Sequence, residues 1–122
     1  MTEKPSLKPV IWIGSSRKDL QVLPGPVQDK VGYALYVAQR GGKHRDAKSL
    51  KGFSGASVQE IVVDYDRGTY RAVYTVRFAE RIYVLHVFQK KAKSGIATPK
   101  SDLELIERRL KQMQEMERDR RK

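Results

Sequence analysis

Basic side chains recur along the stretches of the sequence that are predicted to be strands. Arg71 lies in a predicted strand over residues 70–78, on the face opposite its tyrosines. His86 and Lys90 share one face of the next predicted strand, residues 82–90. Fixed guanidinium and ammonium groups stabilise the negative charge that a phosphodiester gains during cleavage, and an imidazole can carry the proton. Arg71, Lys90 and His86 are therefore the candidate catalytic residues.

Each of these side chains also has a purely structural interpretation. Arg71 could be a solvated strand residue, and His86 could be packed and hydrogen-bonded in the core. Lys90 could simply solvate the end of a strand and protect it from aggregation.

Four further residues are interpreted structurally. Asp64 and Asp66 flank a tyrosine at a predicted turn, where short acidic side chains are common. Tyr33 and Tyr36 in a predicted helix are interpreted as packing groups rather than as base-stacking platforms.

More cations lie in a predicted surface loop over residues 43–55 and in the stretch 90–100, which contains no acid. If these side chains converge on one face of a small sheet, they neutralise several phosphates and bind nucleic acid with strong salt dependence. The predicted nucleic-acid-binding residues are Lys43, Arg45, Lys48, Lys51, Lys91, Lys93 and Lys100.

Composition restricts the chemistry and the partners. The 122 residues include 25 Lys and Arg against 14 Asp and Glu, a net charge of +11, which favours nucleic acid, an acidic protein or an anionic membrane surface as partner. The absence of cysteine excludes disulfides, thiolate zinc sites and cysteine nucleophiles, and fits a reducing cytosol. With two histidines, no phosphate loop and no carboxylate cluster, we expect neither a metal nor a cofactor. No apolar run is long enough for a membrane, so we expect a soluble cytoplasmic protein.

Hydrophobic periodicity predicts one α+β domain over residues 1–116, followed by a basic, frayed tail over 117–122. Strong breaks at Pro24-Gly25-Pro26 and Gly41-Gly42 bound the longer of two N-terminal helices. We expect an antiparallel sheet packed against an N-terminal helical hairpin, with a C-terminal helix. The predicted order is a strand at 9–14, helices at 16–23 and 26–40, strands at 58–65, 70–78 and 82–90, and a final helix from Pro99.

The predicted faces follow from spacing. Apolar residues three and four apart give one stripe on each long helix, and alternation divides the last strand between two faces. The stripes are Val27, Val31, Ala34, Leu35 and Ala38 in one helix, and Leu103, Ile106, Leu110 and Met113 in the other. In the last strand, Tyr83, Leu85 and Val87 are expected on one face, with Ile82, Val84, His86, Phe88 and Lys90 on the other.

Several stretches together resemble the RelE/HigB toxins of type II toxin–antitoxin systems, in the phage-derived branch of the RelE/ParE superfamily. The resemblance covers residues 10–113. It rests on Tyr70-Arg71-Ala72-Val73-Tyr74, Val84-Leu85-His86-Val87-Phe88-Gln89-Lys90-Lys91, Thr98-Pro99-Lys100, Ser15-Ser16-Arg17-Lys18-Asp19-Leu20 and Gly32-Tyr33-Ala34-Leu35-Tyr36.

The resemblance implies a RelE-like fold and cleavage of mRNA in the ribosomal A site, with the RNA's own 2′-hydroxyl as nucleophile. It implies that Arg71 contacts the scissile phosphate, that Lys90 is a second basic residue of the site and that His86 occupies a histidine position of this branch. The implied partners are mRNA, ribosomal RNA and a cognate helix-turn-helix antitoxin, through which alone operator DNA is contacted.

The sequence also departs from RelE. The strand over residues 58–63 lacks RelE's basic catalytic residues, and RelE's C-terminal tyrosine has no counterpart, so the acid and the base remain open. Two alternatives stay open as well. One is a gyrase-poisoning toxin of the ParE type, and the other is a non-enzymatic basic binding module.

Overall fold

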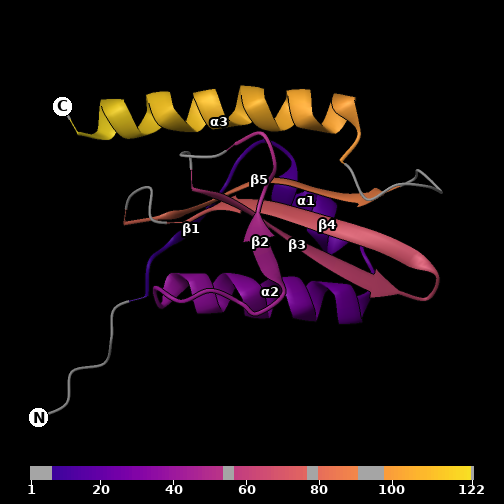
Figure 1. The fold of residues 1–122 in the computed structure, drawn as a ribbon. Helices are drawn as coiled ribbons and strands as arrows, with labels where there is room; N and C mark the ends of the chain where they lie inside the picture. The colour runs from indigo at the N-terminus through magenta and orange to yellow at the C-terminus, as the bar shows by residue number, and fades with distance from the viewer. Residues whose placement is uncertain (1–6, 54–56, 77–79, 91–97, 122) are drawn as a thin grey trace, which may run out of the picture.

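A computed structural model describes residues 7–53, 57–76, 80–90 and 98–121. Figure 1 shows three layers, with the sheet in the middle, α2 on one side and α3 on the other. The α+β fold class predicted from the sequence is confirmed. The elements are β1 (Val10–Trp12), α1 (Ser16–Gln21), α2 (Gly25–Gln39), β2 (Ala47–Ser49), β3 (Val58–Tyr65), β4 (Gly68–Thr75), β5 (Ile82–Lys90) and α3 (Lys100–Arg120).

The sheet has the strand order β1-β5-β4-β3-β2. Strands β3, β4 and β5 form the predicted antiparallel meander, but β1 pairs parallel to β5, so the sheet is mixed rather than wholly antiparallel. Strand β2 forms an edge beside β3, inside the segment that was expected to be a surface loop. Its three residues include the exposed Lys48 and Ser49 and show no apolar alternation that would predict a strand.

One face of the sheet packs on α2. The predicted stripe of α2 is buried, because its spacing of three and four residues places it on a single side of the helix. Tyr74 of β4 belongs to this core and is 1 % exposed, and burial raises the pKa of its phenol to about 12. The outer side of α2 carries Tyr33 and Tyr36, which are 59 % and 42 % exposed, so the prediction that they are packing groups is wrong.

The other face of the sheet packs on α3. Ile106, Leu110 and Met113 of the predicted stripe are buried against this face, with Leu103 beside them. The helix does not fray after Met116 but continues to Arg120. It continues because Glu117, 4 % exposed, accepts a hydrogen bond from the Tyr83 hydroxyl and another from Arg120 Nη2 at 2.9 Å.

A β-bulge interrupts the pairing of β4 with β5. Val73 pairs with His86 and Tyr74 with Val84, which leaves Leu85 without a partner in register. Leu85 packs in the core on the α3 side, and His86 also points to this side, where it contacts Asp102 of α3. The predicted alternation of β5 is therefore correct through Leu85 and wrong from His86 onward, because a bulge shifts the side-chain phase by one residue. Val84 lies on the α2 side, apart from His86 and Phe88.

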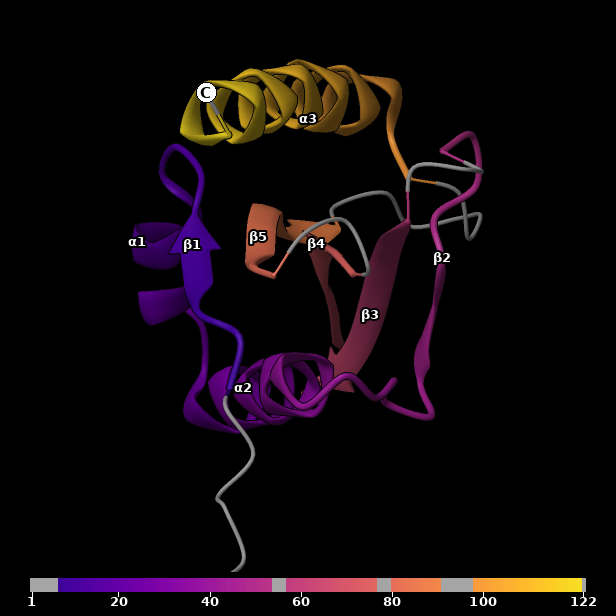
Figure 2. The same cartoon turned by 90° about the vertical axis from the view of Figure 1, so that its left-hand side faces the viewer.

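Figure 2 shows α1 beside β1, at the end of the sheet opposite β2. The Ser16 hydroxyl of α1 donates to the Val84 carbonyl at 3.2 Å, which ties the helix to β5. Across the described ranges, no helix combines the length and apolar character needed to cross a membrane.

Candidate functional site

A pocket of about 560 Å³ opens on the α3 side of the sheet, between β2, the middle of β3 and β4, and the start of α3. Its elements come from distant parts of the chain, and the register of β2, β3 and β4 brings their side chains together. The lining residues are Lys48, Ser49, Leu50, Lys51, Glu60, Arg71, Thr98 and Leu103.

The candidate catalytic Arg71 lies in this pocket and pairs with a carboxylate. Its Nη1 donates to Glu60 Oε2 at 2.9 Å and to Thr98 Oγ1 at 3.1 Å. The side chains of Arg71 and Glu60 are only 5 % and 6 % exposed. In such surroundings the two charges interact strongly, and each compensates part of the cost of burying the other.

Sequence reasoning missed Glu60. Glu60 lies on the same face of β3 as Val58 and Val62, which are two residues before it and two residues after it. Val62 pairs with Arg71 in the register of β3 and β4. A lone carboxylate among β-branched apolar residues was the available sign, because buried acids are nearly always paired. Choosing its partner required the β3–β4 register, which the sequence does not state.

Two predicted nucleic-acid-binding lysines border the pocket. Lys48 Nζ lies 4.0 Å from Glu60 Oε1, and its side chain is 64 % exposed. The exposed Lys51 lines both this pocket and an adjoining one, which Lys100 of α3 also lines. The pocket thus has a buried guanidinium at its floor and ammonium groups toward solvent.

His86 lies on the same face but outside the pocket lining. Its Nε2 is 2.7 Å from Asp102 Oδ1, and its ring stacks on Phe88 with ring centroids 4.4 Å apart. Burial lowers the pKa of His86 below 6.5, although Asp102 opposes the shift. Its Nδ1 is buried and makes no hydrogen bond within the described ranges. Phe88 pairs with Arg71 in register, so the aromatic ring lies between the histidine and the arginine.

Arg109 of α3 holds the bulge that precedes His86. Its Nη1 donates to the Leu85 carbonyl at 2.8 Å, and its Nη2 reaches Ser15 Oγ at 3.3 Å. Gly14 makes this approach possible, because a Cβ there would lie 2.8 Å from Arg109 Nη2. The glycine also has φ +57°, which disfavours a side chain.

The remaining predicted residues divide between two sides of the molecule. Lys90, opposite Thr69, ends the strand that carries His86, whereas Lys91 and Lys93 lie outside the described residues. Lys43 and Arg45 do not reach the pocket of Arg71; they line a different pocket beside α2.

The pocket of Arg71 combines the groups that phosphodiester chemistry needs. A guanidinium can hold a phosphate through paired hydrogen bonds, a neighbouring carboxylate can accept a proton, and rim ammonium groups can neutralise charge.

Comparisons with known proteins give a structural likeness and a family. The crystal structure of the toxin–antitoxin complex RelBE2 from Mycobacterium tuberculosis is similar at a TM-score of 0.46 and 21 % sequence identity, over 75 % of this chain and 100 % of that chain. No curated protein matches the sequence. Residues 18–111 match the family described as phage derived protein Gp49-like. The chain therefore belongs to this phage-derived family of RelE/HigB-type toxins, as the resemblance predicted.

Proposed function

We propose that this chain is a ribosome-dependent mRNA endonuclease. Its family makes it a toxin of a toxin–antitoxin system. The observation that carries the proposal is the buried Arg71–Glu60 pair at the floor of an open pocket with Lys48 and Lys51 at its edge. This pair suits a reaction in which a cation binds the phosphate and a neighbouring carboxylate accepts a proton, because both side chains line the pocket.

In the proposed reaction, the scissile phosphate takes over hydrogen bonds of Arg71 and thereby releases Glu60 from the arginine. Glu60 then accepts the proton of the RNA 2′-hydroxyl, whose oxygen attacks the phosphorus. The bond between phosphorus and the 5′-oxygen then breaks, which leaves a 2′,3′-cyclic phosphate, and Lys48 or Lys51 donates a proton to the departing 5′-oxygen. The RNA provides the nucleophile, so no covalent enzyme intermediate forms.

His86 and Lys90 take supporting parts in this proposal. Glu60 is better suited than His86 to accept the 2′-hydroxyl proton, because His86 Nε2 contacts Asp102 and Nδ1 is buried. Lys90 follows Phe88 on the side of β5 that bears Arg71, where its ammonium group adds positive potential.

The proposed partners are mRNA in the A site, ribosomal RNA, and a helix-turn-helix antitoxin that neutralises the chain and alone contacts operator DNA. The place of action would be the cytoplasm, where translating ribosomes are found.

Mapping of mRNA 5′ ends in cells that produce the chain tests this function. We expect new ends inside reading frames with the wild type, and at least a hundredfold fewer with Arg71→Gln or Glu60→Gln, since charge stabilisation and proton transfer each contribute about that factor. Arg67→Gln, an exposed arginine at the β3–β4 turn, is the matched control and should leave the ends unchanged. DNA damage without new mRNA ends would contradict the proposal and favour a gyrase poison.

A further inference from the structure

The outer side of α2 carries aromatic and basic groups that the proposed reaction does not use. Tyr33 is the more exposed of its two tyrosines, at 59 %. The rings of Tyr33 and His44 pack edge to face, with centroids 5.6 Å apart and an interplanar angle of 83°. The Arg40 guanidinium lies 5.8 Å from the ring centroid of Tyr36. Large exposed aromatic side chains of this kind suggest a ligand that covers them.

Tyr33 also borders a pocket of about 580 Å³ between α2 and the segment that follows it. Three cations and one carboxylate are among its seven lining residues. The net positive charge per residue is therefore much higher in the pocket than in the whole chain, which has a net charge of +11 over 122 residues. The lining residues are Lys30, Tyr33, Val37, Lys43, His44, Arg45 and Asp46.

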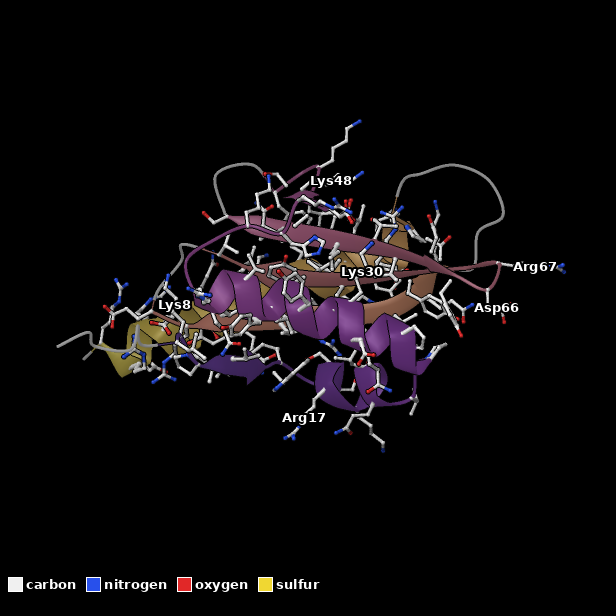
Figure 3. All side chains as sticks on the ribbon, turned by 90° about the horizontal axis from the view of Figure 1, so that it is seen from below. Lys8, Arg17, Lys30, Lys48, Asp66 and Arg67 are labelled. Atoms are coloured by element: carbon white, nitrogen blue, oxygen red, sulfur yellow. The ribbon has the colours of Figure 1, made fainter. Side chains whose placement is uncertain are left out.

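Internal contacts leave much of this positive charge available. Asp46 is held by Lys30, whose Nζ is 3.0 Å from Oδ2, and this contact lowers the pKa of the carboxyl. Arg45 approaches Asp46 only to 3.9 Å, and its side chain is 91 % exposed. Lys43 makes no ion pair with the described residues. Figure 3, which looks onto α2, shows Lys30 on the flank of the helix that faces β2.

We propose that this pocket is a second RNA-docking surface, in which Tyr33 stacks on an unpaired base while Lys43 and Arg45 hold the adjoining phosphates. Unpaired bases stack on tyrosine rings, and basic side chains beside the ring hold the backbone. Val37 is the only aliphatic residue in the lining, whereas Lys43, Arg45 and the Tyr33 ring match the phosphates and bases of an RNA strand. RNA therefore fits this surface better than an acidic protein does.

The surface lies across the sheet from the pocket of Arg71. Figure 1 shows α2 and α3 covering opposite sides of the sheet, and the two pockets are lined from those two sides. An RNA bound at Tyr33 is therefore a different segment from the one to be cut. This part of the inference rests on the proposed function, since a ribosome-dependent nuclease needs contacts to RNA besides its substrate.

Binding of the full chain to a fluorescent single-stranded oligoribonucleotide of about 12 nucleotides, uniformly 2′-O-methylated, tests the proposal. The methyl groups block cleavage, so that binding is measured alone. We expect Tyr33→Ala to weaken binding about tenfold with an unchanged salt slope, because it removes stacking and no charge. Lys43→Gln with Arg45→Gln should lower the slope of log K against log salt by about 1.4.

Two matched controls make the result specific. Tyr65→Ala removes a tyrosine that is 39 % exposed at the β3–β4 turn and should leave affinity unchanged. Arg17→Gln with Lys18→Gln removes two exposed cations of α1 and should change the slope less than the Lys43 and Arg45 pair does. Equal affinities of Tyr33→Ala and Tyr65→Ala would overturn the proposal.

Two further measurements separate this proposal from its alternatives. Tighter, Tyr33-dependent binding of a fluorescent poly-glutamate peptide would overturn the proposal in favour of an acidic protein partner. Arg71→Gln should keep the Tyr33-dependent RNA binding. If mRNA cleavage proves absent while that binding persists, the proposed nuclease fails and the docking surface stands.

Discussion

The two faces of the sheet are built on different principles. On the α2 side, Val27, Val31 and Leu35 pack on Ile61 and other apolar residues. Gln59, two residues before Ile61 on β3, is buried on this side but carries no charge. On the α3 side, buried ionisable groups interrupt the core. These are the Arg71–Glu60, His86–Asp102 and Tyr83–Glu117 contacts, with Arg109 bound to the bulge carbonyl.

We infer from this difference that the α2 side mainly stabilises the fold, whereas the α3 side carries the candidate site. A buried ion pair contributes little net stability, and well-packed apolar residues of similar size often replace it without loss. The α2 side demonstrates that apolar packing suits this sheet. Among the polar groups on the α3 side, Arg71 and Glu60 are the pair that borders an open pocket, and we infer that this pair is retained for chemistry.

Breaking and replacing the Arg71–Glu60 pair gives the largest expected effect. Arg71→Ala should lower the free energy of unfolding by about 3–5 kcal/mol, because it leaves the Glu60 charge buried and alone. The double variant Glu60→Leu with Arg71→Met should regain wild-type stability or exceed it, yet lose mRNA cleavage at least a hundredfold. Urea unfolding and 5′-end mapping measure the two quantities. A double variant as unstable as Arg71→Ala would show that the pair serves the fold.

A cavity on the opposite side sharpens the comparison. Ile61→Ala should lower the free energy of unfolding by about 2–5 kcal/mol, because Ile61 is fully buried against α2. Cleavage per folded molecule should stay at the wild-type level, since Ile61 faces away from the pocket. Urea unfolding and cleavage normalised to the amount of folded protein check this prediction. A loss of cleavage per folded molecule would contradict the division of roles between the two faces.

The elements with regular periodicity were predictable from sequence. The stripe of α2 repeats every three to four residues, and β3 and β5 have the predicted bounds. Contacts between distant segments were not predictable in this way. The bulge at Leu85 has no glycine or proline to mark it, and α3 extends past Met116 because Glu117 meets Tyr83, 34 residues earlier in the chain.

The candidate site was predictable only in part. The alternation of β4 identified Arg71 as separate from the tyrosine face, and the structure brings it together with Lys48 and Lys51. Glu60 was not predicted because its pairing with Arg71 depends on the register of β3 with β4. Lys43 and Arg45 were grouped with the site because they are close in sequence to Lys48, but β2 turns the chain from one side of the sheet to the other.

A methyl group at Gly14 should have a smaller effect, confined to the α3 side. Gly14→Ala should lower the free energy of unfolding by about 1–2 kcal/mol, because φ +57° disfavours a side chain and the new Cβ would meet Arg109. The His86 imidazole signals in NMR spectra should shift as the bulge moves. Gly25→Ala, with no atom within 4 Å of the added Cβ, is the control and should leave stability and these signals nearly unchanged.

The smallest expected effect is a pH dependence from His86. The folded protein lowers the pKa of His86, so the unfolded chain binds more protons below pH 6.5 and stability falls as the pH drops through that range. His86→Gln should reduce this slope between pH 7.5 and 5.5, whereas Ile61→Ala should lower stability equally at both values. Urea unfolding at the two pH values measures it, and an unchanged slope in His86→Gln would be inconsistent with a buried neutral imidazole.

The chemistry of the cut ends tests the central claim most directly. If the RNA 2′-oxygen attacks the phosphorus in the pocket of Arg71 and Glu60, upstream fragments from cells producing the wild-type chain end in a 2′,3′-cyclic phosphate and downstream fragments begin with a 5′-hydroxyl. We predict these ends with the wild type and none with the Glu60→Leu, Arg71→Met variant at equal amounts of folded protein. Fragments with 5′-phosphates, or the same ends from the double variant, would contradict it.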